Sequence, residues 1–387
     1  MRVLFLTHSF PRFAGDAAGS FLHRLASALR DENVDVHVIA PAAPGLKESE
    51  SVDGIPVERF RYAPHSLETL AYTGTMAQDV AGSWTARLAL LGYMGAGLAK
   101  SLGAQRRFAP DVIHAHWWFP SGVLGAAVSR YSRAPLVTTM HGTDVRLARS
   151  IHVSQPLFRN VMRRSSRVTV VSSWLAAEVI AIVPGISPIV APMPIAAEKF
   201  SPGGLRKVSR FLFVGRLNRQ KGLQHLLHAM ARLDDSVELD VVGNGPDDRE
   251  LKALAAASGL HGRITWHGQL NQSFLQALYR AATALIVPSI DEGLGLVAAE
   301  ALMCETPVIA FRSGGLTDVI EHERTGLLAS PADLDELVAA MMRILARPAE
   351  AIGFGKAGRI AASELFLPAP AARRYAAIYR DAAGPKS

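Results

Sequence analysis

The chain has 387 residues, of which 49% are hydrophobic and 19% are charged, and its formal net charge is +7 at pH 7. This length favours two domains, and so much apolar material excludes a disordered chain. The single cysteine, Cys304, excludes an intrachain disulfide and a cysteine-based metal site.

The basic surplus lies in the first half of the chain. Residues 1–200 contain 20 Lys and Arg against 14 Asp and Glu, whereas residues 201–387 contain 21 against 20. This asymmetry is compatible with a phosphorylated substrate, an anionic membrane surface or nucleic acid, and equally with a basic surface that has no charged partner. Because no run of five basic residues occurs, we expect no nucleic-acid partner.

Neither the N-terminus nor the interior predicts a membrane-inserted segment. The apolar run before His8 is too short for a signal-peptide core, and the stretch between Arg87 and Lys100 is shorter than the ~20 residues that span a bilayer. We therefore expect a cytoplasmic protein. Peripheral contact of the basic first half with the inner face of the membrane stays open.

Buried strands alternate with helices along the first half. A helix is expected at 20–31, and strands are expected at 3–7, 34–40, 111–114, 136–140 and 167–172. Continuous apolar strands separated by helices are typical of a parallel sheet covered on both faces. Residues 63–108 have a helical pattern, which favours a helical pair on that sheet over an amphipathic helix that touches lipid.

The same pattern restarts in the second half. Strands are expected at 210–214, 238–242, 264–267, 284–287 and 306–310. Residues 184–204 contain five prolines and three glycines, a composition typical of a linker. The sequence therefore predicts an α/β fold with two Rossmann-like, doubly wound domains that face each other across a cleft.

The most informative segment follows the strand at 284–287. Gly293 and Gly295 lie in a loop that allows close backbone approach, and the helix that starts near Leu296 has free N–H groups suited to a diphosphate. Glu292 in the loop and Glu300 in the helix are placed to accept hydrogen bonds from both ends of a nucleotide-sugar. The alternative, a chance spacing with Glu300 facing solvent, is disfavoured by the flanking strand and glycines.

A second loop, 215–222, follows the first strand of the second half. Arg216 and Lys221 are suited to pair with a diphosphate and to stabilise a departing nucleotide. The alternative is that both are solvated surface cations. The position of the loop at the carboxyl end of a strand favours a binding role, because ligands bind at that edge of open α/β sheets. Later turns are expected to shape the nucleoside pocket, and the residues concerned are Gly243, Gly268, Gln269 and Leu270.

In the first half, His141 follows the strand at 136–140 and is a candidate to bond the transferred sugar, although a lone histidine is usually structural. His114 and His116 would face one side of a strand, but no carboxylate cluster accompanies them, so we expect no metal site. The pair Asp333 and Asp335 lies near a helix start and is expected to cap that helix. No metal or other cofactor is predicted; the nucleotide-sugar is a co-substrate.

Together these motifs resemble the retaining glycosyltransferases of family 4, which have the GT-B fold. The likeness covers nearly the whole chain and rests on Glu-x7-Glu from Glu292 to Glu300 and on Gly215-Arg216-Leu217 with Lys221-Gly222. It implies an acceptor-binding domain at 1–190, a linker at 191–203 and a nucleotide-sugar-binding domain at 204–368. A final helix within 369–387 is implied to pack back on the first domain.

The resemblance also implies residue roles. Arg216 and Lys221 would hold the diphosphate, Glu300 the ribose and Glu292 the hydroxyls of the transferred sugar, with His141 near that sugar. The implied catalytic residues are therefore His141, Arg216, Lys221 and Glu292. Backbone contacts to the donor are implied for Gly215, Gly293, Leu294, Gly295 and Leu296. On the acceptor side the resemblance implies Gly19. We also expect His116, Trp117 and Asp144 there, because aromatic faces suit sugars, although these aromatic residues could equally be core.

The implied reaction is transfer of a hexosyl group, with retention, from a nucleotide-sugar to a hydroxyl acceptor. A UDP-sugar is the favoured donor, and the acceptor is a saccharide, a lipid-linked saccharide or a small natural product. The alternatives are a GT-B-type epimerase or phosphorylase and a non-catalytic nucleotide-sugar-binding protein. Leu294 stands where the family more often has Phe, which leaves the donor sugar open.

Overall fold

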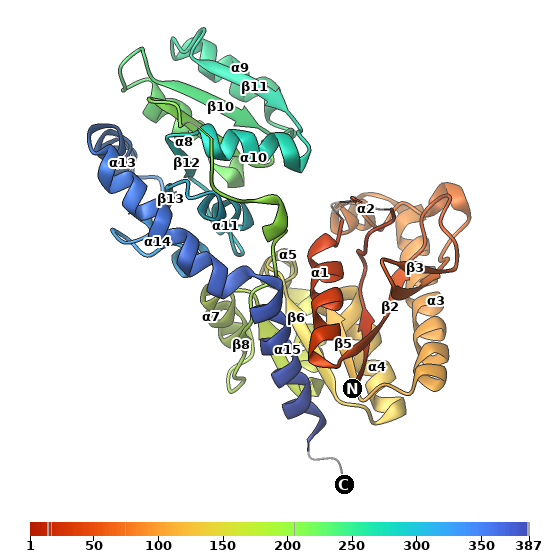
Figure 1. Ribbon diagram of the computed structural model, residues 1–387. Helices are drawn as coiled ribbons and strands as arrows, with labels where there is room; N and C mark the ends of the chain where they lie inside the picture. The colour runs from red at the N-terminus through yellow and green to blue at the C-terminus, as the bar shows by residue number, and fades with distance from the viewer. Residues whose placement is uncertain (14, 17, 74, 205, 385–387) are drawn as a thin grey trace. The chain divides into compact units, whose positions relative to one another are not determined.

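The computed structural model describes residues 1–13, 15–16, 18–73, 75–204 and 206–384. Leu205 and residues 385–387, which fall in the predicted second domain and final helix, lie outside that description. The chain forms two compact units (Figure 1). Unit 1 comprises Met1–Pro194 and Pro368–Ser387, and unit 2 comprises Ile195–Leu367.

Unit 1 is built on a sheet with the strand order β3-β4-β2-β1-β5-β6-β7-β8. Neighbouring strands are parallel except for the antiparallel pair β3–β4. The strands are β1 Arg2–Leu6, β2 Asp35–Pro41, β3 Ser49–Val52, β4 Ile55–Phe60, β5 Val112–His116, β6 Leu136–Met140, β7 Arg167–Val170 and β8 Ile189–Val190. The strand order reverses direction between β1 and β5, which makes their carboxyl ends the expected ligand edge.

Helices cover both faces of this sheet. On one side α3 packs against α4, and on the other α1 packs against α15, the last helix of the chain (Figure 1). The helices are α1 Ser20–Leu29, α2 Met76–Gly82, α3 Trp84–Phe108, α4 Val123–Ser132, α5 Thr143–Ser150, α6 Gln155–Arg164, α7 Ser173–Ile182 and α15 Pro368–Ala383. Tyr375 and Tyr379 join α15 to the sheet: the Tyr375 hydroxyl donates to the Ala191 carbonyl (2.9 Å), and the Tyr379 hydroxyl bonds His114 Nδ1 (2.7 Å).

Unit 2 has a fully parallel sheet in the order β11-β10-β9-β12-β13-β14. Its strands are β9 Arg210–Val214, β10 Glu238–Val242, β11 Ile264–Gly268, β12 Ala284–Val287, β13 Val308–Phe311 and β14 Gly326–Ala329. Its helices are α8 Leu223–Met230, α9 Asp248–Ala257, α10 Gln272–Ala281, α11 Leu296–Met303, α12 Leu316–Val319, α13 Leu334–Ala346 and α14 Pro348–Phe366. Here the strand order reverses between β9 and β12.

The predicted fold class is confirmed: both units are doubly wound α/β domains. The central strands occur where their apolar runs predict them, and the helical pair expected within 63–108 is α2 with α3. Asp333 caps α13, as expected, by accepting from the Glu336 N–H (2.9 Å). Four strands were not predicted, namely β3, β4, β8 and β14. β8 has only two residues and β3 is polar, so neither produces an apolar run.

Removing the hydrogen bond between Tyr379 and His114 tests how much this contact of α15 stabilises unit 1. Tyr379 is fully buried, and replacing it with Phe leaves His114 Nδ1 without this partner. We expect Tyr379→Phe to lower the free energy of unfolding by about 1–3 kcal/mol, measured by urea unfolding. Tyr131→Phe is the matched control, because Tyr131 is exposed, and it should change the value by less than about 0.5 kcal/mol. Equal losses in the two variants would contradict this role.

Candidate active site

In unit 2, two loops meet at the carboxyl ends of β9 and β12. Residues 215–222 follow β9 and residues 288–295 follow β12. The Ile290 N–H donates to the Gln220 carbonyl (2.8 Å), and a Cβ on Gly222 would lie 1.9 Å from the Pro288 carbonyl oxygen. Only glycine allows this approach, because Gly222 also has a φ of 74°. The two loops therefore form one surface at the point where the strand order reverses.

An ion pair joins these loops. Lys221 Nζ donates to Glu292 Oε2 at 2.5 Å, and the two side chains are only 23% and 12% exposed. Asn218 fixes the backbone of the lysine, because its Oδ1 accepts from the Lys221 N–H (3.1 Å). Arg216 is exposed on the same loop. The predicted cations and the loop carboxylate thus lie at one edge of the sheet.

The N-terminus of α11 begins beside this pair. Gly295 precedes the helix with a φ of 85°, and a Cβ there would lie 2.6 Å from Leu316 Cδ2. Leu294 is buried, and Gly293 and Leu296 are half-buried. The first N–H groups of a helix have no intrahelical acceptor and carry partial positive charge, so this end of α11 is suited to an anion.

A third loop holds Glu292, and sequence reasoning missed it. After β13, the Gly315 N–H donates to the Glu292 carbonyl (2.7 Å), and the Asp291 N–H donates to Ser313 Oγ (2.9 Å). A Cβ on Gly314 would lie 2.0 Å from the Glu292 carbonyl oxygen. The available signal was the pair of adjacent glycines shortly after a buried strand.

Glu300 is oriented by a tyrosine from α10. The Tyr279 hydroxyl donates to Glu300 Oε2 at 3.0 Å, and the Tyr279 carbonyl accepts from Thr306 Oγ1 (2.6 Å). Tyr279 is fully buried, and burial raises the pKa of its phenol well above the ordinary value, so the hydroxyl keeps its proton. Glu300 therefore has a fixed orientation on α11. The sequence did not indicate Tyr279, which lies 21 residues from Glu300.

The remaining donor-side residues come to the same edge. A Cβ on Gly243 would lie 1.9 Å from the Gly215 carbonyl oxygen, and the Gly243 N–H donates to the Gly268 carbonyl (2.8 Å). Gln269 and Leu270 follow directly after β11. The structure thus brings the predicted donor-side residues together along the carboxyl ends of β11, β10, β9 and β12.

Unit 1 carries a separate cluster of histidines and aromatic rings at its own switch point. Trp117, directly after β5, packs against His8 and His141, with ring centroids 4.1 and 4.3 Å apart. His116 Nδ1 lies 3.3 Å from His141 Nε2. Phe21 on α1 adds a ring 5.3 Å from that of His141. The predicted residues His116, Trp117 and His141 are therefore neighbours.

Two members of this cluster, His8 and Phe21, were not predicted. His8 lies two residues beyond the end of β1, so its place at the carboxyl end of the first strand was the available signal. Gly19 brings α1 close: it has a φ of 67°, and a Cβ there would lie 2.4 Å from the Ser9 carbonyl oxygen. Gly19 thus lets α1 begin against the loop that carries His8.

Burial keeps these imidazoles neutral. It lowers the pKa of His8 to about 4 and that of His141 to about 3. Burial also lowers the pKa values of His114 and His116 well below the ordinary value, and neighbouring histidines lower them further. At neutral pH the cluster therefore offers hydrogen bonds and apolar ring faces rather than charge.

Asp144 fixes the turn that carries His141. Its Oδ1 accepts from the backbone N–H groups of His141 (3.1 Å) and Gly142 (2.9 Å), and its carbonyl accepts from Trp118 Nε1 (2.7 Å). Burial raises the pKa of its carboxyl to about 6, against the lowering effect of these N–H bonds. These contacts give Asp144 a positioning role, whereas its contact with an acceptor stays a prediction.

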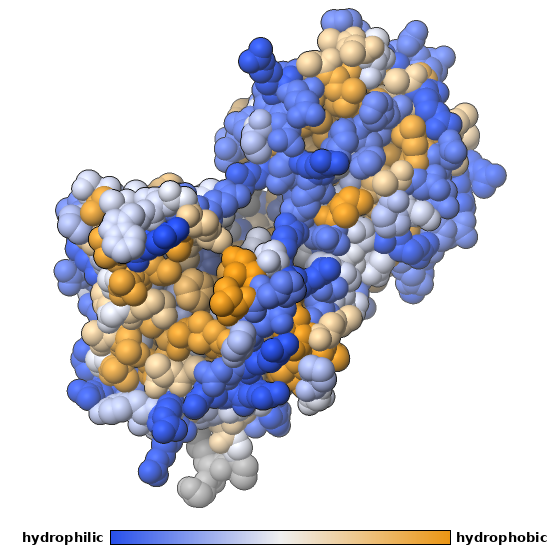
Figure 2. Space-filling model, turned by 180° about the vertical axis from the view of Figure 1, so that it is seen from behind, coloured by the Kyte–Doolittle hydropathy of each residue, from blue (hydrophilic) through white to orange (hydrophobic). Residues whose placement is uncertain are grey.

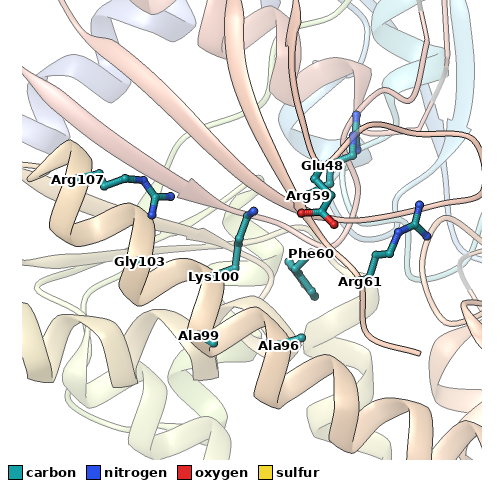
Figure 3. Close-up of a pocket in the computed structure, with 9 residues that line it drawn as sticks. All are labelled: Glu48, Arg59, Phe60, Arg61, Ala96, Ala99, Lys100, Gly103 and Arg107. Atoms are coloured by element: carbon teal, nitrogen blue, oxygen red, sulfur yellow. The ribbon is translucent and has the colours of Figure 1, made fainter. Parts of the chain in front are cut away.

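A pocket of about 460 Å³ opens between β4 and α3 in unit 1 (Figure 3). Arg59, Arg61, Lys100 and Arg107 line it, but each of these cations pairs with a glutamate. The predicted site residues do not line this pocket. Within the described ranges, no three His, Cys, Asp or Glu side chains are grouped to hold a metal. The described helices likewise include none with the length and apolar character to cross a membrane.

Two family models match the chain. Residues 17–191 match the glycosyl transferase 4-like domain, and residues 197–360 match the glycosyl transferases group 1. The chain is also 30% identical over 382 residues to a D-inositol 3-phosphate glycosyltransferase of Pseudarthrobacter chlorophenolicus, covering 90% of this chain and 87% of the relative. The chain belongs to the group 1 glycosyltransferases of family 4 type. The predicted family and enzyme class are therefore confirmed.

Other similar proteins support the same family and fold. A glycogen synthase of Mycobacterium tuberculosis is 28% identical over 387 residues, covering 93% of this chain and 89% of the relative. The sucrose-phosphate synthase of Thermosynechococcus elongatus superposes with a TM-score of 0.80 at 25% identity, covering 98% of each chain. HepE of Anabaena, crystallised with UDP and glucose, superposes with a TM-score of 0.73 at 20% identity, covering 98% of this chain and 99% of HepE. The GT-B fold is confirmed.

The buried histidines predict that this glycosyltransferase loses stability in mild acid. Above pH 6.5, the ordinary pKa of histidine, both the folded and the unfolded chain hold these rings neutral. As the pH falls from about 6.5 towards the lowered folded pKa values, only the unfolded chain binds the protons, so the free energy of unfolding falls. Asp144 has the opposite effect below about pH 6, but it is a single group acting against several histidines.

Urea unfolding between pH 7 and pH 5 measures this effect, which we expect to reach about 2 kcal/mol for each fully buried histidine at pH 5. His141→Asn should reduce the proton uptake on unfolding by about one proton. His65→Asn is the control, because the side chain of His65 is 66% exposed. A pH dependence that is the same in both variants would show that the buried cluster is not its source.

Proposed function

We propose that this glycosyltransferase binds a UDP-sugar in unit 2 and transfers the hexosyl group, with retention, to a hydroxyl acceptor bound by unit 1. The observation that carries the proposal is the Lys221–Glu292 pair beside Arg216 and the N-terminus of α11, where the strand order of unit 2 reverses. The complex of HepE with UDP and glucose supports the choice of UDP, since HepE has the same fold.

Each part of the nucleotide-sugar donor has a proposed binding partner in unit 2. Arg216, Lys221 and the first N–H groups of α11 bind the diphosphate, because they place positive charge at that edge. Glu292 accepts from hydroxyls of the transferred sugar. Glu300, oriented by Tyr279, accepts from the ribose hydroxyls. The backbone of Gly243 and residues 268–270 lies beside the base.

Bond breaking places negative charge on the departing diphosphate. Arg216, Lys221 and α11 would neutralise it from fixed positions, which is the main way in which an enzyme lowers such a barrier. Because protein groups supply this charge, we propose that no metal ion is required. As the bond between the anomeric carbon and phosphate oxygen breaks, the acceptor oxygen bonds that carbon from the same face and its proton passes to the diphosphate.

Retention has a direct consequence. A donor with an α-linked sugar should give an α-linked product, which the anomeric proton coupling of fresh product reports by NMR. A β-linked product would contradict this mechanism.

The acceptor side is proposed to be the ring cluster of unit 1. Trp117 offers an apolar face of the kind that sugars and apolar aglycones contact, and the neutral imidazole of His141 offers hydrogen bonds to hydroxyls, with the buried His116 beside it. By family resemblance, His141 acts on the transferred sugar. Gly19 and Asp144 hold the two loops that carry the cluster. The proposed acceptor is a saccharide, a lipid-linked saccharide or a small natural product.

A thermal-shift screen identifies the donor base. UDP at about 100 times its dissociation constant should stabilise the folded chain by about 2.7 kcal/mol, and ADP and GDP at the same concentration should stabilise it less. A larger effect of ADP or GDP would overturn the choice of UDP. An absence of stabilisation by every nucleoside diphosphate would overturn the proposed site itself.

Charge neutralisation is tested by removing each cation. Arg216→Ala and Lys221→Ala should each lower turnover by about a hundredfold or more, as for loss of a group that stabilises transition-state charge. Arg219→Ala is the matched control, because Arg219 is an exposed cation on the same loop and should change turnover little. Release of UDP from the donor, with and without acceptor, measures turnover and separates transfer from epimerisation. Wild-type rates in both alanine variants of the pair would refute the assignment.

A further inference from the structure

Helix α3 buries one face in unit 1 and leaves three large apolar side chains of its first two turns exposed. The face turned to the sheet and to α4 carries Ala86, Ala89, Gly97 and Ala104. Small residues are needed there: a Cβ on Gly97 would lie 2.9 Å from Leu124 Cδ1, and one on Gly92 would lie 2.2 Å from the Tyr62 carbonyl oxygen. Tyr93 is also buried on this face, so the inner side of α3 is fully used in the core of unit 1.

The outward face carries an apolar stripe, which we define as Trp84, Leu88 and Leu91. These side chains are 69%, 51% and 70% exposed. Their spacing of four and three residues places them on one side of the helix, above one another. A water-exposed stripe that includes a tryptophan is unfavourable on a surface that meets only water. Figure 2 shows orange, hydrophobic residues gathered on unit 1, at the left of that view.

Every charged residue on α3 itself is basic. Between Asp79 and Asp111 the sequence has four basic residues and no acidic residue. Arg87 lies beside the stripe and donates to the carbonyls of Val80 and Ala81, which places its cation at the corner between α2 and α3. Arg106 is exposed on the last turn of α3.

The other cations of α3 belong to a different face. Lys100 and Arg107 line the pocket beside β4 (Figure 3). Both pair with Glu58, at 3.4 and 2.7 Å. One shared carboxylate therefore offsets part of their charge inside unit 1. Arg87 and Arg106 carry the charge of the outward face.

We propose that the outward face of α3 docks unit 1 on an anionic lipid surface. A helix with an apolar face and flanking Arg residues lies in the plane of the interface, with the apolar side chains among the acyl chains and the cations near the lipid phosphates. Tryptophan is favoured at that depth because its ring is apolar and its N–H is polar. This surface is distinct from the proposed donor and acceptor residues.

The stripe fits lipid better than a second copy of the chain. A stable protein interface uses roughly 20–30 residues a side, whereas the stripe has three large apolar side chains on a single helix. A second copy would also bring Arg87 and Arg106 against a surface of the same positive charge. Anionic lipid instead supplies the opposite charge.

Cosedimentation with lipid vesicles tests the proposal. The full chain should bind vesicles of phosphatidylcholine mixed with phosphatidylglycerol and should bind pure phosphatidylcholine weakly, with binding that falls as salt rises. The triple variant Trp84→Ser, Leu88→Ser, Leu91→Ser should lower the affinity by about tenfold or more. Arg87→Gln should lower it by about fivefold, the effect of about one surface charge.

The matched control is the triple variant Met342→Ser, Ile352→Ser, Ile360→Ser, which removes comparably exposed apolar side chains from unit 2. It should bind the mixed vesicles as the wild type does. Circular dichroism and urea unfolding establish that both triple variants fold. Equal binding by the two triple variants, or no binding of the wild type to mixed vesicles, would overturn the proposal. A wild-type dimer that the stripe variant converts to monomer, without vesicle binding, would also overturn it.

A labelled variant gives a readout that does not depend on large substitutions. Cys304 is buried, so Leu88→Cys provides an accessible thiol for a polarity-sensitive fluorophore. On mixed vesicles its emission should shift to the blue, because the probe enters the acyl region. The same label on Ile360→Cys, in unit 2, should not shift. Identical responses of the two labels would contradict docking through α3.

Discussion

The ion pair between Lys221 and Glu292 is the interaction on which the donor site of unit 2 depends. Both side chains are largely withdrawn from water, so each needs the other to offset the loss of solvation. The pair can form because glycines let three loops approach closely: Gly222 meets the Pro288 carbonyl, and Gly314 meets the Glu292 carbonyl. Backbone packing at the switch point thus places a cation, a carboxylate and the N-terminus of α11 on one edge of the sheet.

The ring cluster at the switch point of unit 1 consists of neutral side chains rather than charged ones. Its switch point holds His8, His116 and His141 around Trp117, and burial keeps these rings neutral. Such a surface suits hydroxyls and apolar faces, whereas the cations of unit 2 suit a diphosphate. The proposed division between donor and acceptor follows from this contrast. The stripe on α3 adds a third chemistry, because its exposed apolar side chains and flanking arginines match neither kind of site.

Sequence patterns predict the buried central strands and hence the fold class, because a fully buried strand requires a continuous apolar run. They also indicate Lys221, Glu292 and His141, each of which lies in the loop that follows such a strand. Tyr279, Ser313 and Gly314 escape prediction because they act on residues that only the folded chain brings near. The polar strand β3 and the two-residue strand β8 escape because neither contains a long apolar run.

Calorimetric titration of UDP and of uridine is the most direct test of the central claim, that Arg216 and Lys221 bind the donor diphosphate. The wild type is compared with the double variant Arg216→Ala, Lys221→Ala. The account predicts that the double variant binds UDP at least about tenfold more weakly, while its affinity for uridine changes less than about twofold, because the nucleoside lacks the charged group that the cations contact. An unchanged affinity for UDP, or an equal loss for both ligands, would contradict it.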